Sequence, residues 1–170
     1  DFVKLSKIAK LIRFNMSVIT PLVINKEEEI LYDLGIHFRL TDMNAHHGRQ
    51  YGNVYYENYI KIISDFLNKT KINNIFLASD NFESKENSIK YLLDYGFTRD
   101  NIHNNNSEII STTENNSSFN TFQKRNFGNK SFFIEVLKDV FNLSKSNYLI
   151  YRTSNVSNLA ILLSNTLSSE

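Results

Sequence analysis

The sequence predicts an α/β fold of the Rossmann-like type, in which a parallel sheet is covered by helices on both faces. Short apolar runs rich in β-branched and aromatic residues alternate along the chain with longer segments of helical periodicity. The 170 residues are 41% hydrophobic, which is enough apolar material for a sizeable core. We therefore expect residues 1–170 to form a single domain.

The first expected elements are a lead-in helix and a strand. Residues 5–13 carry apolar side chains three and four positions apart, which is the spacing of one helix face. Pro21 and an acidic stretch separate this lead-in part, residues 1–30, from LGIHFR at residues 34–39. The β-branched and aromatic side chains of that run favour a buried strand.

The middle of the chain predicts helices alternating with strands. Residues 54–70 have apolar side chains at helical spacing and lead into the strand IFLAS at residues 75–79. The apolar face of this helix consists of Tyr55, Tyr59, Ile62, Ile63 and Phe66. A second helix is expected to start at Ser84 and to stop at Gly96, because glycine is common just after a helix. A weak strand is expected next, at residues 109–110.

The last third predicts a loop and a final helix, strand and helix. Residues 112–130 are polar and of low complexity, which suits a long surface loop. Residues 131–146 predict a helix, residues 147–151 a buried strand, and residues 155–167 a closing helix capped by Ser154 or Asn155. The inward face of the first of these helices is expected to consist of Phe133, Val136, Leu137, Val140 and Leu143.

Composition argues against several classes of function. The net charge is +1 with acids and bases mixed along the chain, so a nucleic-acid partner is not expected. The sequence has no cysteine, which excludes disulfides, zinc–thiolate sites and thiol nucleophiles. No apolar stretch reaches the roughly 20 residues that span a bilayer. We expect a cytoplasmic protein without a transmembrane segment, with peripheral attachment to the inner membrane as the alternative.

Residues able to bind a ligand follow three of the predicted strands. They are His37, Arg39 and Asp42 after the first, Asp80 after the second, and Arg152, Thr153, Ser154 and Asn155 after the last. Because parallel strands present their carboxyl ends at one edge of the sheet, these groups should meet there. A guanidinium fork and the free N–H groups that open a helix together suit a pyrophosphate.

Each of these residues also has a simpler interpretation. Arg39 could equally form a salt bridge with Asp42 or Asp80, and Asp80 taken alone is a turn or helix-cap residue. Adjacent histidines such as His46 and His47 rarely bind one ion, and no third ligand has suitable local spacing, so no metal site is expected. A loop histidine is a candidate general base, although simple surface exposure is the stronger alternative.

Three segments together resemble the fucosyltransferase family that includes the α-1,6-fucosyltransferases of N-glycan cores and the nodulation fucosyltransferases. HFRLTD matches the family pattern H-x-R-[RH]-x-D at every fixed position but the [RH] position, where Leu40 stands, and IFLASD meets I-[FY]-L-A-[ST]-D. The late helix–strand–helix block is met by FFIEVLKDVFNLSKSNYLIYRTSNVSNLAILLS. The resemblance covers nearly the whole chain and implies the donor-binding half of a GT-B glycosyltransferase.

The resemblance also implies a reaction and roles for individual residues. Fucose would pass from GDP-fucose to an oligosaccharide acceptor with inversion and without a metal ion or other cofactor. Arg39 would hold the β-phosphate, Asp139 would recognise guanine beside His37, and Ser154 would contact a phosphate. Asp80 matches an essential aspartate of the family, and His47 is the candidate base. The remaining proposed donor-binding residues are Asp42, Thr153 and Asn155.

The chain departs from the family pattern at three positions. Leu40, Met43 and Asn81 replace a basic residue, a lysine and an aspartate. Two alternatives therefore stay open, namely another nucleotide-sugar donor and a non-catalytic nucleotide- or sugar-binding domain. The sequence starts at Asp1 rather than Met, so we also expect an N-terminal partner domain outside this chain.

Overall fold

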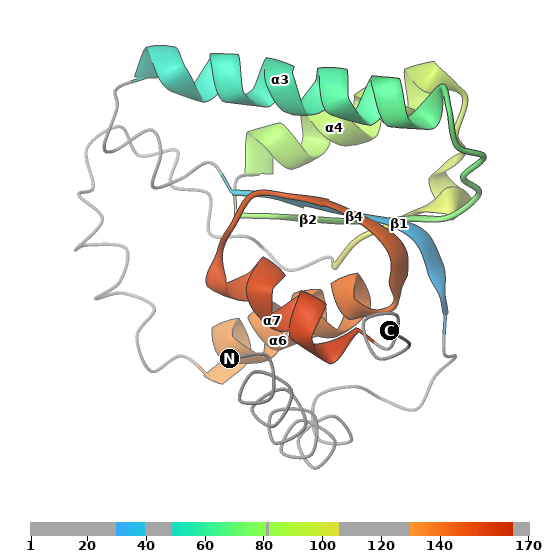
Figure 1. Cartoon of the computed structure of the whole chain (residues 1–170). Coiled ribbons are helices and arrows are strands. Elements are labelled where there is room, and N and C mark those ends of the chain that lie inside the picture. Colours follow the sequence, from blue (N-terminus) through green and yellow to red (C-terminus); the bar gives the residue numbers. More distant parts are fainter. Residues whose placement is uncertain (1–29, 40–48, 81, 106–129, 165–170) are drawn as a thin grey trace, which may run out of the picture.

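Four strands form a single sheet at the centre of the molecule, in the spatial order β3-β2-β1-β4 (Figure 1). They are β1 (Tyr32–Phe38), β2 (Ile75–Ser79), β3 (Ile102–His103) and β4 (Ser146–Tyr151). The computed structural model describes residues 30–39, 49–80, 82–105 and 130–164. All strand pairs within these residues are parallel, which confirms the predicted Rossmann-like α/β fold.

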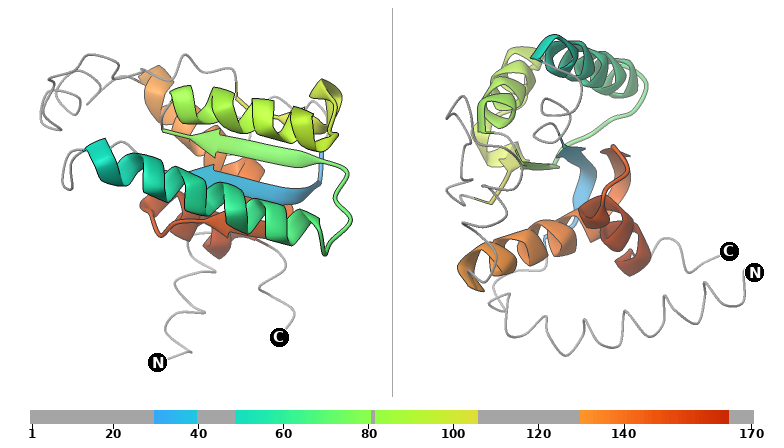
Figure 2. Two further views of the ribbon diagram at one scale, coloured as in Figure 1. Left: turned by 90° about the horizontal axis from the view of Figure 1, so that it is seen from above. Right: turned by 90° about the vertical axis from the view of Figure 1, so that its left-hand side faces the viewer.

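Helices cover both faces of the sheet (Figure 2). One face carries α3 (Arg49–Leu67) and α4 (Phe82–Tyr95), and the other carries α6 (Lys130–Ser144) and α7 (Asn155–Leu163). A short 3-10 helix, η1 (Arg99–Asn101), leads into β3. Because both faces are covered, the central strands are nearly continuous apolar runs, as in IFLAS of β2.

A separate apolar core fills each side of the sheet. The core under α3 and α4 contains Leu34, Ile36, Phe38, Tyr59, Ile63, Leu67, Ile75, Leu77, Ile89, Leu92 and Ile102. The core under α6 and α7 contains Tyr32, Phe76, Ala78, Val140, Leu143 and Ala160. Alternation along β1 therefore sends Ile36 and Phe38 toward α3, and His37 between them toward α7.

The path of the chain creates a switch point between β1 and β4. From β1 the chain adds β2 and then β3 on one side, through α3 and α4. It then returns through α6, on the opposite face, to place β4 on the other side of β1. In open parallel sheets, ligands bind outside the carboxyl ends of the strands at such a point.

The end of α4 at Gly96 agrees with the sequence prediction, but the starts of α3 and α4 differ from it. The N–H of Gly96 donates to the Leu93 carbonyl, and that of Phe97 donates to the Leu92 carbonyl, which is the Schellman arrangement. Gly96 has a φ of 118°, a conformation that favours glycine. The preceding helix, α4, begins at Phe82 rather than Ser84, and α3 begins at Arg49, five residues before the predicted start.

Three predictions of burial are wrong. Phe133 is 61% exposed and Ile62 is 53% exposed, whereas Phe141 and Leu67 take buried positions on the same two helices. These helices carry apolar residues on more than one face, so the pattern alone does not decide which residue turns inward. The strand β4 was predicted to be buried, but it lies at the edge of the sheet and its Tyr148 is 50% exposed. The prediction failed because an apolar run looks the same in an edge strand as in a central strand.

Several expected elements lie outside the described residues. They are the lead-in helix at 5–13, the weak strand at 109–110 and residues 112–129 of the predicted loop. Residue 130 begins α6. The short strand β3 was not predicted, because two residues are too few to show a period of two.

Candidate functional site

Residues from three strand ends lie together at the carboxyl edge of the sheet. Phe38 pairs with Ser79, which places Arg39 level with Asp80. His37 pairs with Tyr151, which places Arg152 level with Phe38. The N–H of Asp80 donates to the Phe38 carbonyl at 3.3 Å, so the ends of β1 and β2 are joined directly. The expected meeting of these strand ends is therefore observed.

The start of α7 forms the β4 side of this edge. Ser154 is the N-cap: its Oγ accepts from the N–H of Ser157 at 3.0 Å, and Ser157 Oγ accepts from the N–H of Ser154 at 2.9 Å. Ser157 Oγ also lies 2.9 Å from the Arg152 carbonyl, to which it donates. This reciprocal pair selects Ser154 over Asn155 as the cap and orients the first turn of α7 next to the end of β1.

His37 connects β1 to this helix start. Its Nδ1 lies 3.5 Å from Ser154 Oγ, and the residue is only 5% exposed. Burial, reinforced by the positive charge of Arg39, lowers the pKa of His37 to about 4. The imidazole is thus neutral near pH 7, so any positive charge at this edge comes from the arginines.

Tyr59 of α3 is a member of this edge that the sequence did not identify. Its hydroxyl is influenced by both Arg152 and Asp80, although burial has the largest effect and raises its pKa to about 12. The helical pattern identified Tyr59 only as an apolar core residue, and its ring does pack on Phe38 with centroids 4.8 Å apart. The effect of Asp80 and Arg152 on this hydroxyl arises only in the assembled fold, because these residues lie on other elements.

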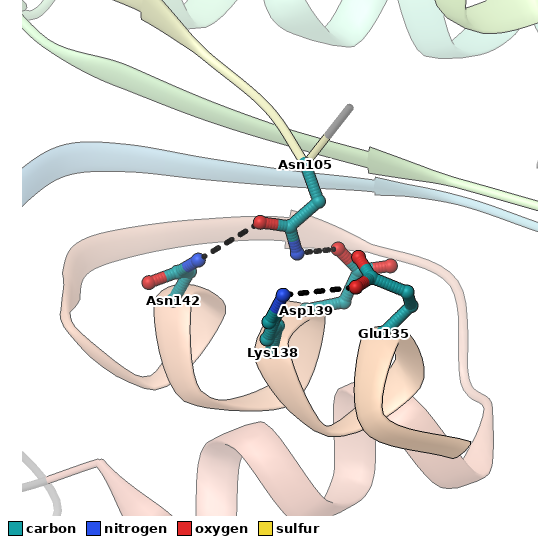
Figure 3. Close-up of polar contacts among 5 residues, drawn as sticks. All are labelled: Asn105, Glu135, Lys138, Asp139 and Asn142. Atoms are coloured by element: carbon teal, nitrogen blue, oxygen red, sulfur yellow. Dashed lines mark hydrogen bonds and ion pairs between the residues drawn. The ribbon is translucent and has the colours of Figure 1, made fainter. Parts of the chain in front are cut away.

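Asp139 belongs to a second polar cluster, at the β3 side of the molecule (Figure 3). Asn105 Nδ2 donates to Asp139 Oδ1 at 2.6 Å, and Asn142 Nδ2 donates to Asn105 Oδ1 at 3.4 Å. Lys85 of α4, itself 5% exposed, donates to the Asn105 carbonyl at 3.0 Å. Asn105 is thus held from both helical layers, since Lys85 lies on one and Asp139 on the other.

The second cluster combines an acid and an amine that are both removed from water. Burial raises the pKa of Asp139 to about 7, although the Asn105 hydrogen bond and the Lys85 charge act in the opposite direction. Burial likewise lowers the pKa of Lys85. In the sheet order this cluster adjoins β3, whereas Arg39 and Ser154 adjoin the β1–β4 boundary. The predicted site residues therefore fall into two groups.

The other predicted residues are exposed at the edge or lie outside the described residues. Thr153 and Asn155 are exposed beside the cap, at the end of β4 and the start of α7. Asp42, His46 and His47 lie outside the described residues, so their roles stay predictions. Across the described ranges, no three His, Asp or Glu side chains are grouped in a way that could hold a metal ion.

Comparison with known proteins identifies no family for this chain. No protein-family model matches the sequence, and no curated protein matches it significantly. Among the helices that the structure describes, none has the length and apolar character needed to cross a membrane.

Proposed function

We propose that this chain is the nucleotide-sugar-binding half of an inverting glycosyltransferase, with GDP-fucose as its donor. The observation that carries the proposal is the convergence of Arg39, Arg152 and the capped start of α7 at the switch point of the sheet. Two guanidinium groups and a row of helix-start N–H groups are suited to the oxygens of a diphosphate. The motifs HFRLTD and IFLASD favour GDP-fucose among the possible donors.

The transfer reaction requires positive charge beside the leaving diphosphate. Breaking the bond between the sugar and the phosphate builds negative charge on the leaving diphosphate, and preorganised donors stabilise that charge. In this proposal Arg39 holds the β-phosphate, the α7 amides share its charge, and neutral His37 supports the nucleotide side. His47 takes the proton of the acceptor hydroxyl, and the acceptor is an oligosaccharide of a bacterial surface glycan.

Asp139 supplies recognition of the base in the same proposal. A carboxylate can accept two hydrogen bonds from the N–H groups on one edge of guanine, and such binding would favour the ionised form of Asp139, whose pKa burial raises to about 7. Asn105 holds one carboxylate oxygen of Asp139, which fixes the orientation of the group. In this proposal the base lies on the β3 side and the diphosphate lies at the ends of β1 and β4. The nucleotide must therefore extend along the carboxyl edge of the sheet.

The first prediction is that GDP stabilises the protein more than UDP or ADP does. A nucleotide present at 100 times its Kd should raise the melting temperature by about 5–10 °C. Replacing Arg39 by Ala removes a charged hydrogen-bond donor and should weaken GDP binding by about 10- to 100-fold. Thermal shift and calorimetric titration measure the two effects.

Arg99→Ala is the matched control, because Arg99 is an exposed arginine of η1, before β3 and away from the carboxyl edge. It should leave GDP affinity unchanged. A protein that prefers UDP or ADP would have a different donor, and GDP binding without transfer to any glycan would indicate a non-catalytic domain. Equal melting temperatures with and without all three nucleotides would exclude the proposal.

A further inference from the structure

The strand β4 is an edge strand whose sequence lacks the usual protections against pairing with another strand. Within the described residues β4 pairs only with β1, and the register of the two strands is constant from Ser146 to Tyr151, without a bulge. The strand, SNYLIY, contains no charged residue and no proline. Edge strands of monomeric proteins are usually short, charged, bulged or covered, because their free N–H and C=O groups pair readily with other strands.

The opposite edge of the sheet, β3, is protected in the usual way. It is two residues long, and the 3-10 helix before it carries Arg99 and Asp100. So short a strand offers few backbone groups for pairing. A head-to-tail arrangement, in which β3 of one copy pairs with β4 of the next, is therefore unfavourable. Among the described strands, the edge that matches β4 in length is β4 of a second copy.

Exposed apolar side chains border the β4 edge on the side of α3. Tyr148 of β4 and Ile62 of α3 are both exposed. The half-buried Phe66, one helical turn after Ile62, meets the Tyr148 ring edge-on, with ring centroids 5.2 Å apart. Ile62, Phe66 and Tyr148 thus form an apolar strip beside the strand. Covering this strip would stabilise a pairing that the backbone groups of β4 direct.

We propose that two copies of this chain associate through β4, which pairs antiparallel with β4 of the second copy and joins the two sheets into one. A twofold axis perpendicular to the sheet keeps each residue on its own face, so opposed residues are an even number of positions apart. Lys145 and Arg152, which flank β4, are an odd number apart and do not oppose each other. With the axis at Leu149, Tyr148 lies opposite Ile150 of the second copy, a favourable aromatic and β-branched pair.

This association does not depend on the proposed nucleotide-sugar function. Antiparallel pairing places the two carboxyl edges at opposite ends of the joined sheet, so each copy keeps its own candidate site. The interface consists of one pair of strands and a short apolar strip on each copy, which is small for a protein interface. We therefore expect a dissociation constant of about 1–100 µM.

Sedimentation velocity of the whole chain over a range of concentrations tests the association and should show an equilibrium between one and two chains. Tyr148→Lys places a charge in the edge strand and removes its exposed ring, so it should raise the dissociation constant about tenfold or more. Ile62→Lys should weaken the association as well, and its exposed position on α3 makes loss of the fold unlikely to interfere. Circular dichroism checks that each variant is folded.

Phe133→Lys is the matched control, because Phe133 is an exposed aromatic residue of α6, on the other helical layer. It should leave the dissociation constant within about twofold of wild type. A wild-type chain that stays monomeric at every concentration overturns the inference. A dimer that folded Tyr148→Lys and Ile62→Lys leave unchanged, or that Phe133→Lys weakens equally, overturns it too. Growth beyond two chains would mean open assembly and would contradict the closed pair.

Discussion

His37 and Asp139 are buried titratable residues whose pKa values move in opposite directions. Burial lowers the pKa of His37 from 6.5 to about 4 and raises that of Asp139 from 3.8 to about 7. The His37 contribution to stability is fully present above pH 6.5 and is lost as pH falls through about 4. The Asp139 contribution is fully present below pH 3.8 and is lost as pH rises through about 7. Between pH 4 and 6.5 the two effects oppose each other.

We predict that single substitutions at these residues separate their two opposing effects on the pH dependence of the unfolding free energy. Relative to wild type, Asp139→Asn should gain about 1.4 kcal/mol of unfolding free energy per pH unit as pH rises from 4.5 to 6. His37→Asn should lose about the same amount over the same interval. Urea denaturation at several pH values measures these slopes. A variant that runs parallel to wild type across the interval would contradict the assigned pKa of its residue.

At the scale of one element, the start of α7 has a structural role, and it is also proposed to bind the diphosphate. The cap that joins Ser154 and Ser157 satisfies N–H groups which the helix itself leaves open. The same cap fixes the first turn of α7, whose remaining N–H groups are proposed to bind the diphosphate. Stability of the helix start and ligand binding are therefore expected to change together.

We predict that Ser154→Ala lowers the free energy of unfolding by about 1 kcal/mol, because it removes the acceptor for the Ser157 N–H. The variant should also weaken GDP binding. Asn158→Ala is the control, since Asn158 is exposed on the same helix and alanine favours helix. Chemical denaturation of both variants measures the difference. Equal stability of Ser154→Ala and Asn158→Ala would contradict the role of the cap.

At the scale of the whole molecule, the sheet depends on close contact between β1 and β4. These strands belong to opposite sides of the switch point, and Gly35 faces Leu149 across the pair. A Cβ added at Gly35 would lie 2.6 Å from Ser146 Oγ and 2.9 Å from Leu149 Cδ1. Side chains of β4 thus fill the space beside Gly35, and any larger residue there would force Ser146 or Leu149 to shift.

We predict that Gly35→Ala destabilises the protein by about 1–3 kcal/mol through overpacking. Ser146→Ala should cost little alone, because the buried Ser146 Oγ has no hydrogen-bond partner in the described part of the chain. The double variant should recover part of the loss, since the nearest clashing atom is gone while Leu149 remains. Urea midpoints of the three variants test this, and purely additive losses would argue against the contact.

The sequence by itself determined the features that depend on neighbouring residues. Periodicity and composition predicted α3, α4, α6 and α7 and the strands β1, β2 and β4, because local propensity and side-chain spacing act over a few residues. The stop at Gly96, and a cap at Ser154 or Asn155, followed from backbone geometry that few residue types supply, and the structure then selected Ser154. The placing of Arg39 and Asp80 directly after strands was equally visible.

Only the tertiary structure decided which of these features meet. Strand order is set by packing between distant segments, so the local sequence could not show that β4 pairs with β1 and places Arg152 level with Phe38. Tyr59 belongs to the apolar pattern of α3, and only burial in the assembled fold raises the pKa of its hydroxyl to about 12. Likewise Asp139 gained its raised pKa from burial beside Asn105 and Lys85, which belong to other elements. Burial and charge depend on three-dimensional neighbours, whereas propensity and spacing depend on neighbours in sequence.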